Sequence, residues 1–286
     1  MTLPKILVVL LLTPAVLLCI AAVAGSLRWA AGTEAIRQRL ERGRLPISPA
    51  VVDFRELEGL PAPVERFFRT VLTDGMPMVS GVRISHGGSL NMGEAEERWR
   101  PFVSDQRVVA KGPGFDWNAR VSLLPGVPVW VHDCFVDGEG ILNGAIYGLF
   151  PVVEMRGGGP IAEGELIRFV AEAPWYPTVL LPSQGVRWEP KDDRSARLSL
   201  VEKGVRVSLT IFFDQEGRIG SVRSEGRGRT VGKEIVPTPW VGRFGEYRKV
   251  EGMVVPMDGE VAWVTPEGEK PYWRGRIREI RYEYAR

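Results

Sequence analysis

Few residues in this chain of 286 have the side chains that nucleophilic or metal chemistry requires. It has two histidines and two cysteines, and one short segment places His132, Asp133 and Cys134 side by side. A cysteine nucleophile needs an imidazole within hydrogen-bond distance. The segment alternates like a β-strand, so His132 and Cys134 share a face about 7 Å apart while Asp133 points to the other face. The spacing therefore argues against a nucleophile.

Other catalytic motifs are incomplete. Ser183 lacks the first glycine of a Gly-x-Ser-x-Gly elbow. The glycine-rich stretches 157–159 and 226–228 match neither a P-loop nor a dinucleotide-binding turn. His86 and His132 stand alone, without the paired spacing of metal ligands. We predict no catalytic residue, no metal site and no cofactor.

The most distinctive stretch is 171–188, which combines prolines, aromatic residues and polar side chains. Rigid aromatic loops of this kind can line the mouth of a pocket. The alternative is that these side chains fill the core at the end of a sheet. If the segment binds a ligand, the candidate residues are Trp175, Tyr176, Trp188, Glu172, Arg187 and Gln184.

Three carboxylates lie on a helix predicted over 160–172. Glu163 and Glu165 are two positions apart and so do not share a helix face. Acid–base catalysis by these residues or by Glu172 would need a partner from elsewhere, such as Arg187 or His86. The sequence leaves an enzyme as an open alternative.

Composition excludes several classes of protein. The chain has 37 Lys and Arg against 35 Asp and Glu, with both signs interleaved, so we predict no nucleic-acid partner. Two distant cysteines exclude a disulfide scaffold. The 44% hydrophobic and 25% charged fractions are typical of a folded protein, and 33 glycines and 22 prolines indicate many turns.

The N-terminus has a run without charge over residues 6–24. A helix that spans a bilayer needs about 20 such residues. The alternative is a cleaved signal peptide, because residues 22–24 read Ala-Val-Ala. The length of the run favours an uncleaved single-pass anchor.

The charges that flank the run bear on which side of the membrane the main domain occupies. Five arginines follow the run, which by the positive-inside rule would place the main domain in the cytoplasm. Most of them lie some distance along the chain, however, and large domains translocate despite charge. We predict an extracytoplasmic domain, after a solvated helix over 29–43.

The remainder alternates with the period of β-strands. A helix with one apolar face is expected at 61–72, after a linker over 45–60. Strands are expected at 80–86, 88–92, 96–101, 104–111, 115–123, 127–136, 141–147, 185–190, 196–200, 205–213, 218–225, 240–247, 250–255, 259–265 and 270–284. The last changes phase near Arg278, which predicts a bulge.

So many strands with short turns predict one large, strongly curved antiparallel sheet. The fold class is mainly β, a half-barrel with one or two helices in its concave face, preceded by the transmembrane helix. The predicted divisions are 1–28 for the anchor, 29–58 for the juxtamembrane helix and linker, and 59–286 for the β-rich domain.

Several motifs resemble a bacterial family of unknown function. They include Leu60-Pro61-Ala62-Pro63-Val64, Trp99-x-Pro101-Phe102, Glu172-Ala173-Pro174-Trp175-Tyr176-Pro177, Thr238-Pro239-Trp240 and Pro271-Tyr272-Trp273-Arg274-Gly275, within residues 58–285. The family has no assigned activity, so the resemblance implies no site residues. The predicted shape also resembles lipoprotein-carrier half-barrels of the LolA type, an analogy of fold alone.

Three hypotheses for the function follow. The first is a membrane-anchored module of the bacterial cell membrane that binds a lipid or another apolar ligand in the cavity of the sheet. The second is an enzyme that acts on a hydrophobic substrate through the carboxylates of the central helix. The third is a structural envelope protein without a ligand.

Overall fold

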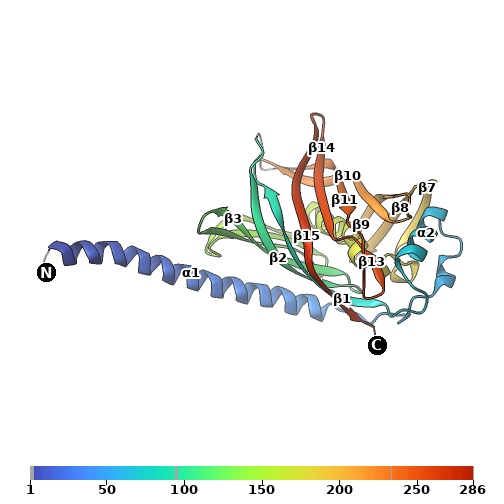
Figure 1. Ribbon diagram of the computed structural model, residues 1–286, viewed down its shortest axis with the longest axis horizontal. Helices are drawn as coiled ribbons and strands as arrows, with labels where there is room; N and C mark the ends of the chain where they lie inside the picture. The colour runs from blue at the N-terminus through green and yellow to red at the C-terminus, as the bar shows by residue number, and fades with distance from the viewer. Residues whose placement is uncertain (1–2, 94–95, 233, 286) are drawn as a thin grey trace.

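A curved sheet and one long helix make up most of the molecule (Figure 1). The computed structural model describes residues 3–93, 96–232 and 234–285. The helices are α1 (Leu3–Arg42), α2 (Ala62–Val71) and α3 (Gly159–Ala171), with short 3-10 helices at Phe54–Leu57, Ala173–Trp175, Pro177–Leu180 and Pro182–Gln184. The strands are β1 (Val79–Asn91), β2 (Trp99–Val109), β3 (Gly114–Leu124), β4 (Val127–Val136), β5 (Glu139–Ile146), β6 (Phe150–Gly157), β7 (Arg187–Asp192), β8 (Ser195–Glu202), β9 (Val205–Phe213), β10 (Ile219–Val231), β11 (Glu234–Gly245), β12 (Arg248–Val250), β13 (Met253–Val255), β14 (Asp258–Thr265) and β15 (Gly268–Tyr284).

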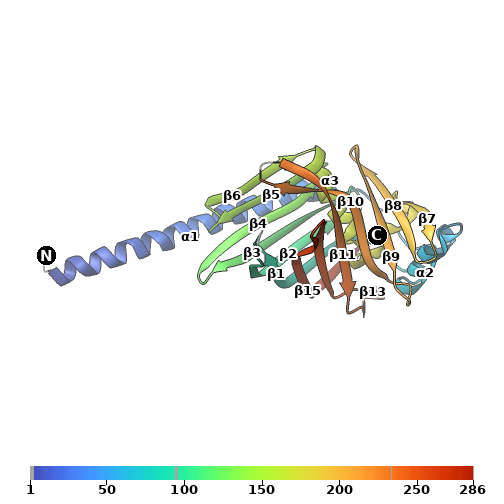
Figure 2. The same ribbon diagram turned by 90° about the horizontal axis from the view of Figure 1, so that it is seen from above.

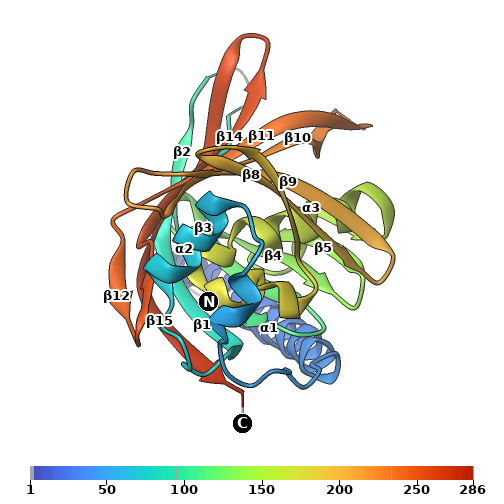
Figure 3. The ribbon, with the colours of Figure 1, turned by 90° about the vertical axis from the view of Figure 1, so that its right-hand side faces the viewer.

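Thirteen of the described strands form one antiparallel sheet in the order β6-β5-β4-β3-β2-β1-β15-β14-β11-β10-β9-β8-β7. The two halves of the chain therefore meet at the centre, where β1 pairs with β15. The edge strands β6 and β7 are neighbours along the chain and are joined through α3 and the 3-10 helices. Figure 3 shows the sheet curving around α2 and α3, which confirms the predicted curved sheet with helices in its concave face.

The apolar faces of the two inner helices form the centre of the core. Val64, Phe67, Phe68 and Val71 of α2 are each at most 1% exposed, as their helical spacing predicts. Leu166 of α3 is completely buried among strands of both halves of the sheet.

Most strands lie where the alternation predicts them, with a few differences. The stretches expected at 80–86 and 88–92 form the single strand β1, and those at 96–101 and 104–111 form the single strand β2. The stretch at 250–255 is divided between β12 and β13, and β6 was not expected at all. Ser85 pairs with Glu279 and His86 with Ile277, which leaves Arg278 as the extra residue of a bulge. The predicted bulge in the last strand is confirmed at this position.

Helix α1 packs against the convex face of β2, β3 and β4 with its C-terminal half. The indole of Trp29 donates to Asn118 Oδ1 at 2.9 Å, and Arg37 forms a 2.7 Å ion pair with Asp116. Leu40 is 3% exposed and belongs to a second, smaller hydrophobic cluster, which it forms with residues of β2, β4 and β5. The expectation of a solvated helix over 29–43 is therefore wrong for the face that meets the sheet.

The predicted span 6–24 falls on the part of α1 that projects beyond the sheet (Figures 1 and 2). The side chains of residues 3–12, 14, 15 and 18 lie outside the described residues. Val16, Leu17, Ile20 and Val23, which are described, are all more than half exposed. Among the residues that the structure describes, no helix meets the length and hydropathy needed to cross a membrane.

Candidate functional site

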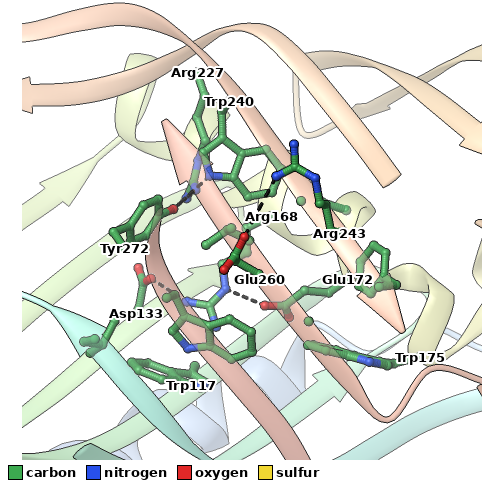
Figure 4. Close-up of a pocket in the computed structure, with 17 residues that line it drawn as sticks. Trp117, Asp133, Arg168, Glu172, Trp175, Arg227, Trp240, Arg243, Glu260 and Tyr272 are labelled. Atoms are coloured by element: carbon green, nitrogen blue, oxygen red, sulfur yellow. Dashed lines mark hydrogen bonds and ion pairs between the residues drawn. The ribbon is translucent and has the colours of Figure 1, made fainter. Parts of the chain in front are cut away.

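A pocket opens on the concave side of the sheet, between α3 and the strands of the sheet centre (Figure 4). Its cavity volume is about 100 Å³. Aromatic and aliphatic side chains form most of its wall, and three arginines and three carboxylates contribute equal and opposite formal charge. The charged residues are Arg168, Arg227, Arg243, Asp133, Glu172 and Glu260, and the aromatic ones are Trp117, Trp175, Trp240, Phe244, Tyr272 and Trp273.

Arg168 of α3 holds the polar side of the pocket together. Its Nη1 lies 2.5 Å from Asp133 Oδ2 and its Nε lies 2.7 Å from Glu172 Oε1, one helical turn further on. Burial lowers the pKa of Arg168, but the charges of Glu172 and Asp133 outweigh it, and the pKa is raised overall. The guanidinium also lies 5.0 Å from the centre of the Trp117 ring. The cation is thus fixed by two carboxylates and an aromatic face.

The carboxyl group of Glu165, also on α3, is buried near Asp133. Burial, and then the charge of Asp133, raise the pKa of Glu165 well above its usual value. Asp133 Oδ1 and Glu165 Oε2 are both buried acceptors for which the described part of the chain supplies no hydrogen-bond donor. A proton on Glu165 supplies that donor and accounts for both atoms, because the protonated carboxyl can donate to Asp133.

The opposite wall is built around Arg227 of β10. Its Nη1 lies 3.0 Å from Tyr272 Oη, and its guanidinium lies 5.1 Å from the centre of the Trp240 ring. Trp240 Nε1 donates to the same tyrosine oxygen at 2.9 Å. Because Tyr272 Oη accepts both bonds, these three side chains form one rigid wall.

The floor of the pocket is an aromatic cluster. Trp175 and Trp273 lie 6.5 Å apart between ring centres, and Phe102 connects Trp273 with Trp117. Within the described residues, the indole nitrogens of Trp117, Trp175 and Trp273 have no hydrogen-bond partner. Indole nitrogens usually find a partner when buried, so these three unsatisfied donors are enclosed within the aromatic packing of the floor.

Of the six predicted ligand-binding residues, the pocket brings together Trp175 and Glu172. Tyr176 is fully buried and donates to Phe169 O at 2.8 Å, and Trp188 packs on Phe68 near α2. Gln184 lies at the Lys111 side chain, and Arg187 is exposed on β7. The expected mouth of Trp175, Tyr176 and Trp188 is not formed, because consecutive 3-10 turns direct these rings into different parts of the core.

The residues that the sequence suggested as candidates for catalysis also lie apart from one another. Glu163 is exposed, whereas Glu165 on the same helix is buried, as their spacing predicts. Cys134 faces away from Asp133 and lies 3.4 Å from Asp116 Oδ1, and burial raises the pKa of its thiol well above the usual value. Burial lowers the pKa of His86 to about 3, so it stays neutral beside Trp175.

Sequence reasoning missed Arg168, Asp133 and Arg227 as members of one site. The sequence did contain a signal for Arg168, because this residue precedes Glu172 by four positions on the predicted helix, where the two side chains can pair. The alternation of β4 also placed Asp133 on the face opposite His132. The contribution of Arg227 had no local signal, since it depends on which strand lies across the cavity.

Comparison with known proteins gives a family and a fold. The model of a family of unknown function, DUF6920, matches residues 58–282, in agreement with the resemblance of the motifs. No curated protein matches the sequence.

Three solved structures are similar in fold at low identity. A LolA superfamily protein from Nitrosomonas europaea has 8% identity and a TM-score of 0.41, with 78% of this chain and 92% of that chain covered. A domain from Vibrio parahaemolyticus described as an outer membrane lipoprotein-sorting protein has 9% identity and a TM-score of 0.39, with 81% and 92% covered. A DUF1329 protein from Desulfovibrio piger has 11% identity and a TM-score of 0.37, with 72% and 86% covered. At these values the structures assign no ligand or activity to this chain.

Proposed function

We propose that this chain, which belongs to the DUF6920 family of unknown function, is a module that binds a lipid or another apolar ligand in the pocket beneath α3. The observation that supports the proposal is the aromatic wall around the cavity. Ligand sites are typically apolar concavities with a few polar groups that fix orientation. Here the guanidinium of Arg168, held in place by Asp133 and Glu172, provides such a group.

The size and charge of the pocket narrow the class of ligand. A cavity of about 100 Å³ is comparable to engineered apolar cavities that take a single ring, of about 150 Å³. It therefore suits one apolar end of a larger molecule. Since the lining charges balance, the ligand's polar part is expected to be neutral or zwitterionic.

In this proposal α1 is a single-pass anchor in the bacterial cell membrane and the β-rich domain is extracytoplasmic. The uncharged run over 6–24 and the exposure of Val16, Leu17, Ile20 and Val23 support the anchor. A binding domain held at the membrane would meet apolar ligands where they are concentrated.

The test compares two single substitutions in strand β14, each made in the full chain. Val261 lines the pocket, and Val261→Trp should fill it, whereas Val264 does not line it and lies on the opposite face of β14. Both proteins are purified from membranes, and bound lipid is measured by extraction and mass spectrometry. We expect Val261→Trp to lose one molecule of ligand per chain that the wild type and Val264→Trp retain. Equal lipid content in all three would contradict the proposal.

A second candidate is an enzyme that acts on a hydrophobic substrate, and one observation favours it. Asp133, Glu165 and Glu172 converge on Arg168 beside the cavity, and the raised pKa of Glu165 keeps a proton available next to Asp133. A carboxyl group with a raised pKa beside a second carboxylate is frequent at sites of acid–base catalysis. If the extracted ligand is chemically altered by the wild type and unaltered by Glu165→Gln, this candidate replaces simple binding.

A further inference from the structure

The turns of two neighbouring hairpins form an uncharged, apolar tip on the same side of the molecule as the N-terminal half of α1. We propose that this tip, made of the β3–β4 and β5–β6 turns, inserts into the surface of the lipid bilayer in which α1 is anchored. The proposal rests on the anchor described above. It adds a second contact with the membrane and a fixed orientation of the domain.

The composition of the tip distinguishes it from every other turn of the sheet. Residues 121–131 and 140–153 contain no charged side chain. Each of the other hairpins that the structure describes has a charged residue in its turn, such as Asp137, Lys203 or Glu267. Soluble proteins normally keep turns polar, so the exception marks a surface with a different environment.

The exposed apolar residues of the tip are large. Phe150 is 62% exposed, Val152 is 55% exposed and Leu124 is 53% exposed. Tyr147 Oη donates to Gly126 O at 2.5 Å and so joins the two turns. The tip is therefore one connected surface rather than two independent loops.

The position of the tip along α1 matches the expected membrane boundary. Strand β5 runs antiparallel to α1, from the 2.9 Å ion pair of Arg39 with Glu139 to the turn at Tyr147. There the backbone of Gly25 approaches Tyr147 so closely that a Cβ would lie 2.0 Å from its carbonyl oxygen. Gly25 directly follows the run over 6–24 and precedes the first charged residue, Arg28, by three positions, so the tip lies at the level where the apolar run ends. Figures 1 and 2 both show the ends of these hairpins beside α1, with the helix projecting beyond them.

The residues around this level are those that favour the interface of a bilayer. Trp130 and Tyr147 of the β5–β6 turn are both partly exposed there, whereas Trp29, 6.1 Å from Trp130 between ring centres, is buried against the sheet. Tryptophan and tyrosine concentrate at the membrane–water interface because their rings are both apolar and polar. Arg28 is exposed at the same level and can meet lipid phosphate groups. A bilayer surface is therefore the occupant that fits this tip.

The test uses fluorescent labels on the full chain in liposomes that contain nitroxide-labelled lipid. The native Cys19 is exposed and Cys134 is buried, so a label on the wild type reports the depth of α1. In a Cys19→Ser background, Phe150→Cys and Leu124→Cys each place the label on the tip. Val201→Cys is the matched control, because Val201 is 49% exposed and its hairpin turn contacts the β4–β5 turn at the other end of the sheet.

We expect the labels at positions 150 and 124 to shift to the blue and to lose fluorescence to the nitroxide, as the label on Cys19 does. The label at position 201 should behave as in water. A quenched Cys19 label with tip labels that match position 201 would overturn the proposal while leaving the anchor intact. An unquenched Cys19 label would overturn the anchor and this proposal together. Neither outcome bears on the pocket, which the tryptophan variants test separately.

Discussion

Arg168 shows how one residue can give an apolar pocket a defined polar side. It is 13% exposed and satisfies Asp133 and Glu172 at once, while its flat guanidinium lies on Phe115 and Trp117. Removing one partner of a buried ion pair typically costs 3–5 kcal/mol, because the other charge is left without compensation. One cation thus holds two carboxylates, whose charges it offsets in part, on the polar side of the pocket.

At the same scale, the buried histidines predict a dependence of stability on pH. Burial, and then the charge of Arg37, lower the pKa of His132 to about 4, against about 6.5 in an unfolded chain. The unfolded state thus binds a proton in this window that the folded state does not. We expect the free energy of unfolding to be highest above pH 6.5 and to fall as the pH drops toward 4, by on the order of 3 kcal/mol from this group.

The measurement is urea unfolding between pH 7 and pH 5, with His132→Gln as the comparison. Thr33 Oγ1 donates to Trp29 O, so it accepts from His132 Nε2 at 2.7 Å, and a glutamine amide can replace that donor. The variant should lose less stability over this range than the wild type. Parallel curves for the two proteins would contradict the assignment.

Residue-level prediction from the sequence reached part of the site. Trp175 and Glu172 were found because an aromatic, proline-rich stretch is conspicuous in composition. Tyr176 and Trp188 belong to the same stretch but serve the core, since a ring's direction in successive 3-10 turns depends on the packing around it. Asp133 and Arg227 come from strands on opposite sides of the cavity, and no spacing along the chain reports that they meet.

At the scale of elements, α1 is part of the folded domain as well as an N-terminal extension. A chain that begins at residue 45 would lose Leu40 from its small core and leave Asp116, which is completely buried, without Arg37. We expect it to be less stable by about 3–5 kcal/mol than a chain that begins at residue 25. Urea midpoints measured with the same probe compare the two, and equal midpoints would show that α1 contributes no stability.

The elements themselves were largely predictable. Helices α2 and α3 follow from apolar residues at helical spacing, and most strands follow from alternation. Strand β6 was missed because it lies at the edge of the sheet, with exposed residues at both faces and Pro151 near its start. Alternation is produced by one buried face, so an edge strand without one gives no pattern to detect.

At the scale of the whole molecule, the curved sheet was predictable and its strand order was not. The number of strands and their short turns require a sheet that curls. The pairing of β1 with β15, however, joins residues about 200 positions apart, as between Arg83 and Glu283. Periodicity describes each strand alone, and the choice of partner is made by the three-dimensional fit of the two halves.

The central place of β15 has a consequence for how the molecule is made. Synthesis proceeds from the N-terminus, and β15 is the last strand of the chain. The edge of β1 that will pair with it must therefore wait, with its backbone groups unpaired, until the chain has been produced through β15. Long-range strand pairing is slow and leaves exposed edges that promote aggregation. Completion of this sheet thus depends on the synthesis of β15, and a nascent chain that stops before Gly268 has two half-sheets with nothing between them.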